Sequence, residues 1–558
     1  MGELKERSQI YLGGEPSARA RRALLYAVGF TSEQIERPLV GIVNTWNELH
    51  AGHRHLNRLA TKIKEGVLMG GGMPAEFNTI SLCDGLAIGH AGMRYILPSR
   101  EVIADSIELT VQAHRFDAMV LIGSCDKIIP GLLMAAARLD IPALVVAGGP
   151  MFPGYWPRFK LKWGESAMSE IAERYNRGGL SEAELEELTR CIYPCAGACW
   201  GMGTANTMAC LTEAVGMSLP GDGTAHATTA KKERLAADAG LKVMKLLKDG
   251  LTPSRIMTEA AFENMLRVNM AIGGSLNTVL HIPAIAHELG ITVTMDRFDR
   301  ISRETPHLCS IEPSGPYFLS DLEEAGGMPG VMKRLEGRLN LDVLTVTGKD
   351  VGANLKQAEI FNDEVIHTVE SPVHEYGGIA VLKGKLASDG AVIKQVAVDE
   401  SLWKFEGPAR VFNSEEDATQ ALLAQEIKAG DVIVIRYEGP KGGPGMREMQ
   451  MFRGLLKLSG LGEKVYLITD GRFSGYSEGP CIGYLSPEAA EGGPIALVKD
   501  GDIISIDIEG RKLEVKVSKN ELDKRLNEWK RPPARVNKGY LARYSATACS
   551  ATEGAIIP

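Results

Sequence analysis

Short apolar runs of two kinds alternate between residues 117 and 150. Residues 117–122 (DAMVLI) form a continuous apolar run with the length of a buried strand. Pro130 then opens a run whose apolar residues have helical spacing (GLLMAAARLD), and proline is favoured in the first turn of a helix. Residues 141–150 (IPALVVAGGP) return to a strand pattern. The pattern predicts a β–loop–α–β unit, the building block of parallel sheets.

The loop of this unit contains Cys125, Asp126 and Lys127. Ligands of open parallel sheets bind beyond the carboxyl ends of the strands, where this loop is expected. The three side chains offer a soft ligand, a hard ligand, and a nucleophile or base. Taken alone, however, the tripeptide is explained more simply as a surface turn with two solvated charges and an ordinary cysteine.

A similar turn comes earlier in the chain. Alternation in residues 77–82 (FNTISL) predicts a strand, and Cys83 and Asp84 follow directly before Gly85. Two such turns in one α/β domain would bring two thiols and two carboxylates to one rim of the sheet.

Three histidines follow another predicted strand, residues 37–46 (RPLVGIVNTW). His50, His53 and His55 together suggest a metal site. The next helix begins among them, however, and their spacing does not place all three on one face. A structural role for these histidines is therefore favoured over a metal site.

The periodicity changes between residues 345 and 375. Residues 377–396 (GGIAVLKGKLASDGAVIKQV) predict a β-hairpin with Asp389-Gly390 at its turn, and more strands are predicted within segments 430–439, 464–471 and 494–517. We therefore expect an α/β protein of two domains. A large N-terminal α/β domain with a parallel sheet would span residues 1–368, and a smaller β-rich, barrel-like domain would span residues 369–558.

Several segments carry glycine at unusual density. The loop at residues 437–449 (YEGPKGGPGMREM) is glycine-rich before Glu448, and TDGRFSG presents Asp470, Arg472 and Ser474. Because glycine costs backbone entropy on folding, we expect a ligand to approach these loops closely. Residues 273–275 (GGS) precede a helical pattern and are expected either to seat a carboxylate on free N–H groups or simply to cap the helix.

A more polar segment, residues 153–187, is expected to be an insertion or lid with a helix around residues 164–178.

Composition narrows the class of protein. The chain has 558 residues, a net charge of −8 and 44% hydrophobic residues, which is typical of a multidomain globular protein. The negative charge argues against nucleic acid or an anionic membrane as a partner. No apolar run reaches the length that spans a bilayer, and the N-terminus lacks a signal-peptide core. We expect a cytoplasmic enzyme.

Nine cysteines are spread unevenly along the chain, with Cys191, Cys195 and Cys199 close together. In a large cytosolic chain such clustering favours metal binding or catalysis over disulfides. Four cysteines scattered elsewhere in the chain are expected to be ordinary core or packing residues, namely Cys210, Cys309, Cys481 and Cys549.

Five long motifs, in consistent order, resemble the dihydroxy-acid and sugar-acid dehydratase family. They are GSCDK-x-x-PG, CDG-x-x-x-GH-x-GMRY-x-LPSRE, ACWGMGTANTM, GGPGMREM and TDGRFSG. The C-terminal LARYSATACSATEGAI is more similar to the branched-chain dihydroxy-acid dehydratases than to the pentonate dehydratases.

The resemblance implies an iron–sulfur cluster beside a Mg²⁺ ion. By motif position, Cys125 and Cys199 would be cluster ligands, and Asp84, Asp126 and Glu448 would be magnesium ligands. Lys127 resembles the lysine that relatives carry as a carbamate on the metal, and Ser474 resembles their proton-abstracting base. This division suits the chemistry, because thiolates prefer iron and carboxylates prefer magnesium.

Two positions depart from the family pattern. Gly52 stands where many two-iron members have a cysteine, so one cluster ligand is missing from its usual place. Cys83 is the preferred substitute and Cys195 the rival, with a 4Fe-4S cluster favoured over a 2Fe-2S cluster. Leu276 stands where the family often has threonine, a second departure that bears on the choice of substrate.

The resemblance thus implies a hydro-lyase that converts a 2,3-dihydroxy carboxylate to a 2-oxo acid in valine and isoleucine biosynthesis. The expected substrates are 2,3-dihydroxyisovalerate and 2,3-dihydroxy-3-methylvalerate, and the expected assembly is a homodimer or homotetramer. One alternative is a sugar-acid (aldonate) dehydratase with a more polar pocket. A remoter one is a non-enzymatic iron–sulfur sensor, which would leave Ser474, Lys127 and Glu448 without a role.

Overall fold

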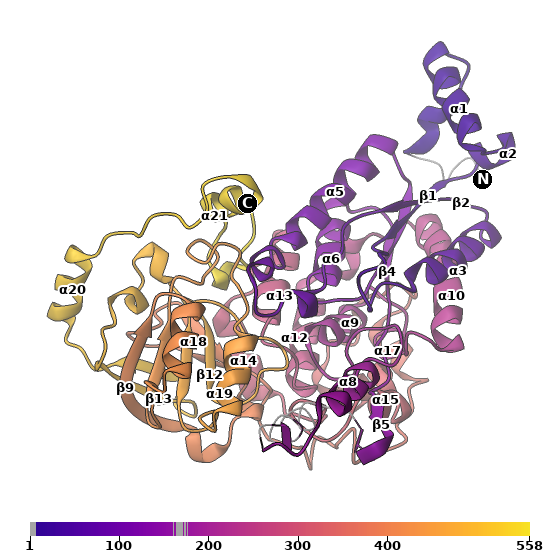
Figure 1. The fold of residues 1–558 in the computed structure, drawn as a ribbon. Coiled ribbons are helices and arrows are strands. Elements are labelled where there is room, and N and C mark those ends of the chain that lie inside the picture. The colour runs from indigo at the N-terminus through magenta and orange to yellow at the C-terminus, as the bar shows by residue number, and fades with distance from the viewer. Residues whose placement is uncertain (1–6, 160, 163–170, 172–173, 176) are drawn as a thin grey trace.

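Four parallel strands form the sheet of the N-terminal region, in the order β2-β1-β3-β4 (Figure 1). The computed structural model describes residues 7–159, 161–162, 171, 174–175 and 177–558. The strands are β1 (Leu39–Asn44), β2 (Met73–Asn78), β3 (Ala118–Gly123) and β4 (Ala143–Ala147). All residues of β1, β3 and β4 are buried, which explains their unbroken apolar runs.

Helices cover this sheet and build the rest of the N-terminal region. Next to the strands lie α3 (Leu56–Met69), α5 (Ser99–His114), α6 (Ile128–Leu139) and α10 (Ala230–Asp249). The other helices of this region are α9 (Thr204–Ala214), α11 (Pro253–Ile256), α12 (Glu259–Ala271), α13 (Thr278–His287), α14 (Met295–Glu304), α15 (Leu319–Glu324), α16 (Gly327–Arg334) and α17 (Val351–Leu355). Of these, α12, α13 and α14 lie toward the C-terminal region in Figure 1. All but one residue of α6 are buried, so its composition is nearly all apolar.

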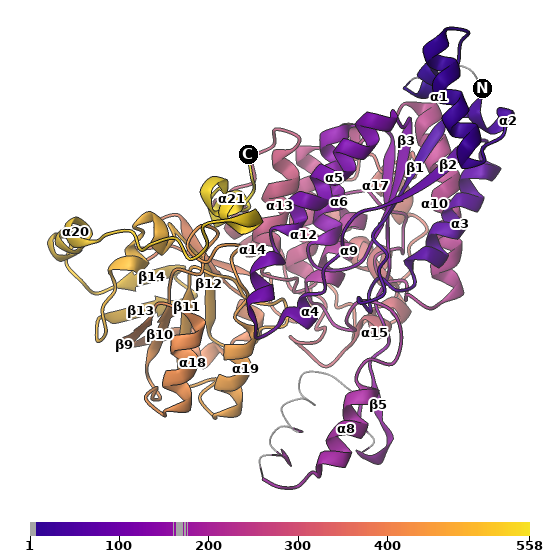
Figure 2. The same ribbon diagram turned by 45° about the horizontal axis from the view of Figure 1, so that its top comes forward.

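Smaller elements extend from this body. The helices α1 (Pro16–Val28) and α2 (Ser32–Ile35) stand at one end, near the N-terminus. At another end, α8 (Glu182–Cys191) projects with the short strands β5 (Tyr155–Trp156) and β6 (Leu161–Lys162), as Figure 2 shows. The expected helix at residues 164–178 falls mostly outside the described residues. None of the helices in the described part of the chain is both long and apolar enough to cross a membrane.

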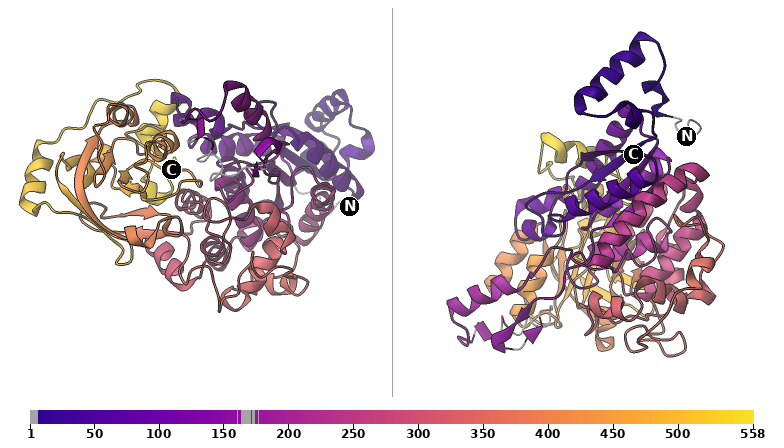
Figure 3. Two further views of the ribbon diagram at one scale, coloured as in Figure 1. Left: turned by 60° about the horizontal axis from the view of Figure 1, so that its bottom comes forward. Right: turned by 90° about the vertical axis from the view of Figure 1, so that its right-hand side faces the viewer.

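The C-terminal region is an eight-stranded sheet that curls into a barrel, visible at the left of Figure 3. Its order is β14-β13-β9-β10-β11-β12-β8-β7, with parallel pairing from β9 to β12 and antiparallel pairing at both ends. A bridge between Lys383 and Lys512 joins the two edges. The strands are β7 (Ala380–Leu382), β8 (Gly390–Ile393), β9 (Lys404–Phe412), β10 (Val432–Ile435), β11 (Tyr466–Thr469), β12 (Cys481–Ser486), β13 (Ile503–Asp507) and β14 (Lys512–Val515).

Four helices accompany this barrel. They are α18 (Glu415–Leu423), α19 (Gln450–Leu458), α20 (Lys519–Glu528) and α21 (Gly539–Thr547). The first two make the crossovers between parallel strands, α18 from β9 to β10 and α19 from β10 to β11. The expected fold class, a parallel α/β sheet followed by a barrel-like sheet, is therefore confirmed.

Two local expectations were wrong. The strand expected at residues 77–82 ends at Asn78, so an extended loop separates it from Cys83. The expected strand at the start of segment 494–517 is instead a short 3₁₀ helix, Pro494–Leu497. The hairpin of β7 and β8 and the β3–α6–β4 unit are confirmed.

Candidate metal and active site

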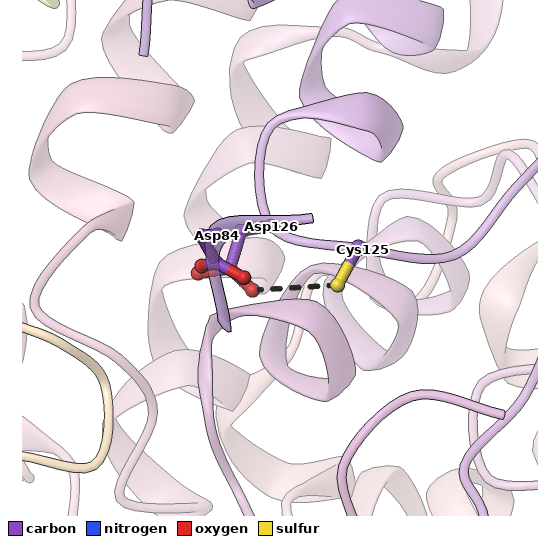
Figure 4. Close-up of side chains that lie close together, drawn as sticks. All are labelled: Asp84, Cys125 and Asp126. Carbon is purple, nitrogen blue, oxygen red and sulfur yellow. Dashed lines mark hydrogen bonds between the residues drawn. The ribbon is translucent and has the colours of Figure 1, made fainter. Parts of the chain in front are cut away.

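The turn after β3 holds three of the candidate residues in direct contact. Lys127 is 1% exposed, and its Nζ donates to Asp126 Oδ2 at 3.1 Å. The Cys125 thiol lies 3.9 Å from Asp126 Oδ1 (Figure 4). The backbone N–H of Cys125 donates to Nε2 of His53 at 3.2 Å, which fixes the start of the turn. The tripeptide is therefore a buried cluster rather than a solvated surface turn.

Asp84 reaches this cluster from the loop after β2. It begins the one-turn helix α4 (Asp84–Ala87), with Cys83 at the preceding cap position. Ligand atoms of Asp84, Cys125 and Asp126 all lie within 4.8 Å of one another, as Figure 4 shows. Because β2 and β3 are parallel strands of one sheet, their carboxyl ends bring these turns to the same edge.

The two carboxyl groups have opposite pKa shifts. Burial and the nearby Asp126 raise the pKa of Asp84 well above its usual value. Burial would also raise the pKa of Asp126, but Lys127 and hydrogen bonds from Asp84 and Lys127 lower it below the usual value. Asp126 therefore ionises readily, and its negative charge opposes ionisation of Asp84. A cation bound between the two carboxyl groups would relieve that repulsion.

Cys199 joins the site from a loop held at the end of β4. The N–H of Met151 donates to Ala198 O at 2.8 Å, and the N–H of Ala198 donates to Gly149 O at 2.9 Å. Burial raises the pKa values of the Cys125 and Cys199 thiols, and the two thiols and Cys83 lie near enough to affect one another. Three thiols therefore gather beside the two aspartates.

Cys195 has different surroundings from Cys83. It packs, partly buried, against a separate apolar cluster that includes Trp156, Leu188 and Trp200. Cys83, by contrast, lies near Asp84 and Asp126. Burial raises the pKa of its thiol, and the charges of the two aspartates raise it further. This difference favours Cys83 as the third thiol of the site.

Glu448 and Arg472 contribute to the site from the C-terminal region. Glu448 lies in the loop after β10 and Arg472 in the loop after β11, and these two strands are parallel neighbours. Their carboxyl ends therefore meet at one edge of the sheet, as those of β2 and β3 do. The side chains of Glu448 and Arg472 form an ion pair with exposures of 4% and 0%, and Arg472 Nε donates to Met446 O at 2.9 Å. The negative charge of Glu448 also raises the pKa of Asp84, so the two carboxylates are close.

Ser474 lies on the wall of a cavity of about 450 Å³ shared by the two regions. Its Oγ accepts a hydrogen bond from the Tyr476 N–H at 3.2 Å. The cavity is also lined by Asp84, Asp126, Cys199 and Glu448. Much of the remaining wall is apolar, from Ile88, Tyr193, Trp200, Met451, Leu455 and Leu458, with Gln450 and Lys457 as polar members. The structure therefore brings the predicted base, thiol and carboxylates to one cavity.

Residues 273–275 were expected either to seat a carboxylate or to cap the following helix, and the structure supports the cap, because Ser275 Oγ accepts a hydrogen bond from the Asn277 N–H at 3.1 Å. The N–H of Ser275 donates to Thr207 Oγ1 at 3.1 Å, and the N–H of Gly274 donates to Asn269 O at 3.0 Å. The first turn of α9 lines the cavity instead, through Gly203, Thr204, Ala205 and Asn206. The signal was present in ACWGMGTANTM, where a glycine and a threonine precede an apolar helical run.

Glycines of the glycine-rich loops allow close packing against other parts of the protein. Gly445 has φ +87°, and a side chain there would overlap the carbonyl oxygen of Arg94. A Cβ on Gly475 would lie 2.8 Å from Ser275 Oγ and from Thr204 N. These glycines let the C-terminal loops dock against the N-terminal region, which places Glu448 and Ser474.

Asp470 has a structural role. It is fully buried and accepts N–H bonds from Tyr437, Glu438 and Ala489. Burial raises the pKa of Asp470 to about 6 despite these hydrogen bonds. Its carboxylate thus joins the β10 and β11 loops instead of facing the cavity.

Leu276 does not line the cavity. It is 1% exposed and belongs to the main hydrophobic core.

Comparison with known proteins agrees with this arrangement. Residues 37–354 match the N-terminal domain of the dihydroxy-acid/6-phosphogluconate dehydratases, and residues 364–555 match the C-terminal domain. The chain belongs to this family. The match covers every candidate site residue, in both regions.

Individual relatives are similar along their whole length. A protein of Methanosarcina acetivorans named dihydroxy-acid dehydratase 1 is 53% identical over 99% of this chain and 100% of its own. Proteins named dihydroxy-acid dehydratase from Methanothrix thermoacetophila and Caldanaerobacter subterraneus are 52% and 51% identical, over 99% and 96% of this chain and 100% and 96% of their own.

Proposed function

We propose that the protein is a dihydroxy-acid dehydratase that removes water from a branched 2,3-dihydroxy carboxylate to give a 2-oxo acid. 2,3-Dihydroxyisovalerate and 2,3-dihydroxy-3-methylvalerate are the proposed substrates, in valine and isoleucine biosynthesis. The observation that carries the proposal is the joint placement of Ser474, two aspartates and Cys199 on one cavity. The names of the full-length relatives support the substrate class.

The donor set fits two metal cofactors. Cys125, Cys199 and Cys83 would hold an iron–sulfur cluster, with a four-iron cluster favoured, because their sulfurs are the soft ligands that iron prefers. Asp84, Asp126 and Glu448 would hold Mg²⁺, together with Lys127 as a carbamate. An ammonium 3.1 Å from Asp126 could not share a cation with it, whereas a carbamate offers oxygen. These cofactors would supply Lewis acidity toward the substrate carboxylate and hydroxyls.

Ser474 would act as the base. Its Oγ would remove the proton from C2, and the hydroxyl on C3 would leave with its electron pair. The resulting enol then takes up a proton at C3 and loses the proton of its 2-hydroxyl to give the 2-oxo acid. The N–H of Tyr476 already points at Ser474 Oγ and would stabilise its negative charge.

The first turn of α9 would face the substrate carboxylate. The backbone at a helix start presents N–H groups and a positive partial charge, both of which favour an anion. Gly203 and Thr204 stand at this position on the cavity wall, close to Gly475.

The apolar part of the cavity wall favours a branched-chain acid over a sugar acid. Ile88, Met451, Leu455 and Leu458 would contact the alkyl group of the substrate. An aldonate would place hydroxyls against these side chains and lose hydrogen bonds to water without replacement. A sugar-acid dehydratase remains the second candidate because the family name covers both classes.

The test is an anaerobic substrate panel. The reconstituted protein would be given 2,3-dihydroxyisovalerate and several aldonates, and formation of the 2-oxo acid would be measured for each. We expect kcat/KM for the branched acid to exceed that for any aldonate by about 100-fold, since one or two buried unpaired hydroxyls cost this much. Higher efficiency on an aldonate would reassign the substrate.

We also propose a cytoplasmic location and a domain boundary between residues 368 and 369. We further propose that the protein assembles as a homodimer or homotetramer. The exposed Leu86, which follows the cavity-lining Gly85, supports assembly because its fractional exposure is 64%.

A further inference from the structure

His50 is a buried residue with one ring nitrogen that lacks a partner. It is 2% exposed, and its Nδ1 accepts a hydrogen bond from the Gly52 N–H at 3.1 Å. Among the residues that the structure describes, the buried Nε2 has no hydrogen-bond partner. A neutral imidazole carries one proton, so acceptance at Nδ1 places that proton on Nε2. His50 therefore holds a buried N–H donor that needs an acceptor.

The segment that carries His50 lies between the two loops that carry Cys125 and Cys199. The N–H of Gly197 donates to Ala51 O at 3.1 Å, and a Cβ on Gly52 would lie 3.6 Å from Gly197 O. On the other side, the His50 and His53 rings lie 4.2 Å apart.

His53 lies between His50 and the Cys125 turn, but both of its ring nitrogens already take part in hydrogen bonds. Its Nε2 accepts from the Cys125 N–H, and its Nδ1 donates to Thr45 O at 2.8 Å. His50 is thus the one of these two rings that can donate toward the thiols. Burial lowers the pKa of His50 to about 4, although Asp126 opposes this, so the ring is neutral near pH 7.

Gly52 makes room for this ring. A Cβ at position 52 would lie 3.2 Å from Cε1 of His50 and would press against it. A side chain at position 52, such as the cysteine expected in two-iron relatives, would therefore require the imidazole to shift slightly.

We propose that His50 donates its Nε2–H to a sulfur of the iron–sulfur cluster, as a positioning residue and not as an iron ligand. The inference rests on the cofactor assignment made under Proposed function. Hydrogen bonds to cluster sulfurs stabilise the reduced state and raise the reduction potential. His50 would therefore replace part of what a cysteine at position 52 supplies in other members, by holding a sulfur in place without ligating iron.

The experiment compares three variants with the wild-type chain after anaerobic purification. His50→Leu removes the donor, and His50→Gln keeps an N–H of similar reach. His226→Leu is the matched control, because His226 is 3% exposed, also lacks a partner at Nε2, and stacks on Phe152. Iron and sulfide would be analysed first, followed by a reductive titration monitored by visible absorption and EPR.

At a potential fixed at the wild-type midpoint, we expect the ratio of reduced to oxidised cluster to fall about fivefold in His50→Leu, as expected for one lost hydrogen bond. His50→Gln and His226→Leu should stay near the wild-type ratio. An unchanged ratio in a His50→Leu protein that holds a full cluster would overturn the inference.

A second measurement uses only the wild-type chain and applies if His50→Leu loses its iron. Pulsed EPR of the reduced protein with ¹⁵N-labelled histidine should show a weak coupling to a histidine nitrogen. A strong coupling would mean direct ligation, and no coupling would mean no contact; either overturns the inference. A wild-type chain that binds no cluster at all would instead refute the cofactor assignment.

Discussion

Arg472 and Glu448 form a buried ion pair across two loops that follow the neighbouring parallel strands β10 and β11. Arg472 also donates to Asn277 Oδ1 at 3.4 Å and to Met93 Sδ at 3.6 Å. The guanidinium thus connects the C-terminal loops to two elements of the N-terminal region. Glu448 consequently has two roles, as the counter-ion of Arg472 and as a proposed magnesium ligand.

This double role predicts the effect of Glu448→Gln. The change leaves a buried guanidinium without its counter-ion, which should lower the free energy of unfolding of the metal-free protein by about 3 kcal/mol. Mg²⁺ should also no longer raise the melting temperature. Glu406→Gln is the control, because its pair with Lys516 is half exposed and should contribute less than about 1 kcal/mol. Equal melting temperatures for both variants would argue against the buried pair.

Asp126→Asn tests whether the proposed magnesium ion and the proposed iron–sulfur cluster have different ligands. Asp126 contacts both the Lys127 amine and the Cys125 thiol, but only its carboxylate charge is suited to Mg²⁺. We expect turnover to fall by about 100-fold or more while the iron content and visible absorption stay close to wild type. Metal analysis and absorption spectra of the anaerobic protein decide the matter. Parallel loss of iron and magnesium would contradict the division of ligands.

Cys83→Ser and Cys195→Ser test the third thiol. Cys83 lies beside Asp84 and near Cys125, whereas Cys195 packs against an apolar cluster around Trp200. We predict that Cys83→Ser loses most of its bound iron and nearly all activity, and that Cys195→Ser keeps substantial amounts of both. Iron and sulfide analysis of the two anaerobic proteins is the measurement. The reverse pattern would make Cys195 the ligand and Cys83 a packing neighbour of Asp84.

Local patterns were sufficient to predict much of the site. The β3–α6–β4 unit could be predicted because β3 and β4 are continuous apolar runs bounded by turn residues. Once those strands are parallel, the carboxyl-edge rule brings Cys125, Asp126 and Asp84 together. Ser474 and Glu448 came from the family resemblance, since no local pattern relates β10 and β11 to the N-terminal sheet.

The remaining features depend on tertiary contacts. Strand β9 includes Gly407 and Pro408, which are depleted in strands, and β12 includes Gly483 beside the Phe473 ring. Neither was predicted. The packing role of Gly445 could not be predicted because its close neighbour, the carbonyl of Arg94, is about 350 residues away in sequence. Likewise, the unpartnered nitrogen of His50 is visible only when the loops around it are in place.

Ser474→Ala tests the central claim most directly, because Ser474 is the group proposed to take the C2 proton. The measurement is the rate of 2-oxo acid formation from 2,3-dihydroxyisovalerate by anaerobic protein whose iron and magnesium contents have been determined. Loss of the base should lower kcat by roughly 10²–10⁴-fold while both metal contents stay at the wild-type level. A Ser474→Ala protein with full metal content and a kcat within about twofold of wild type would contradict the assignment of Ser474 as the base.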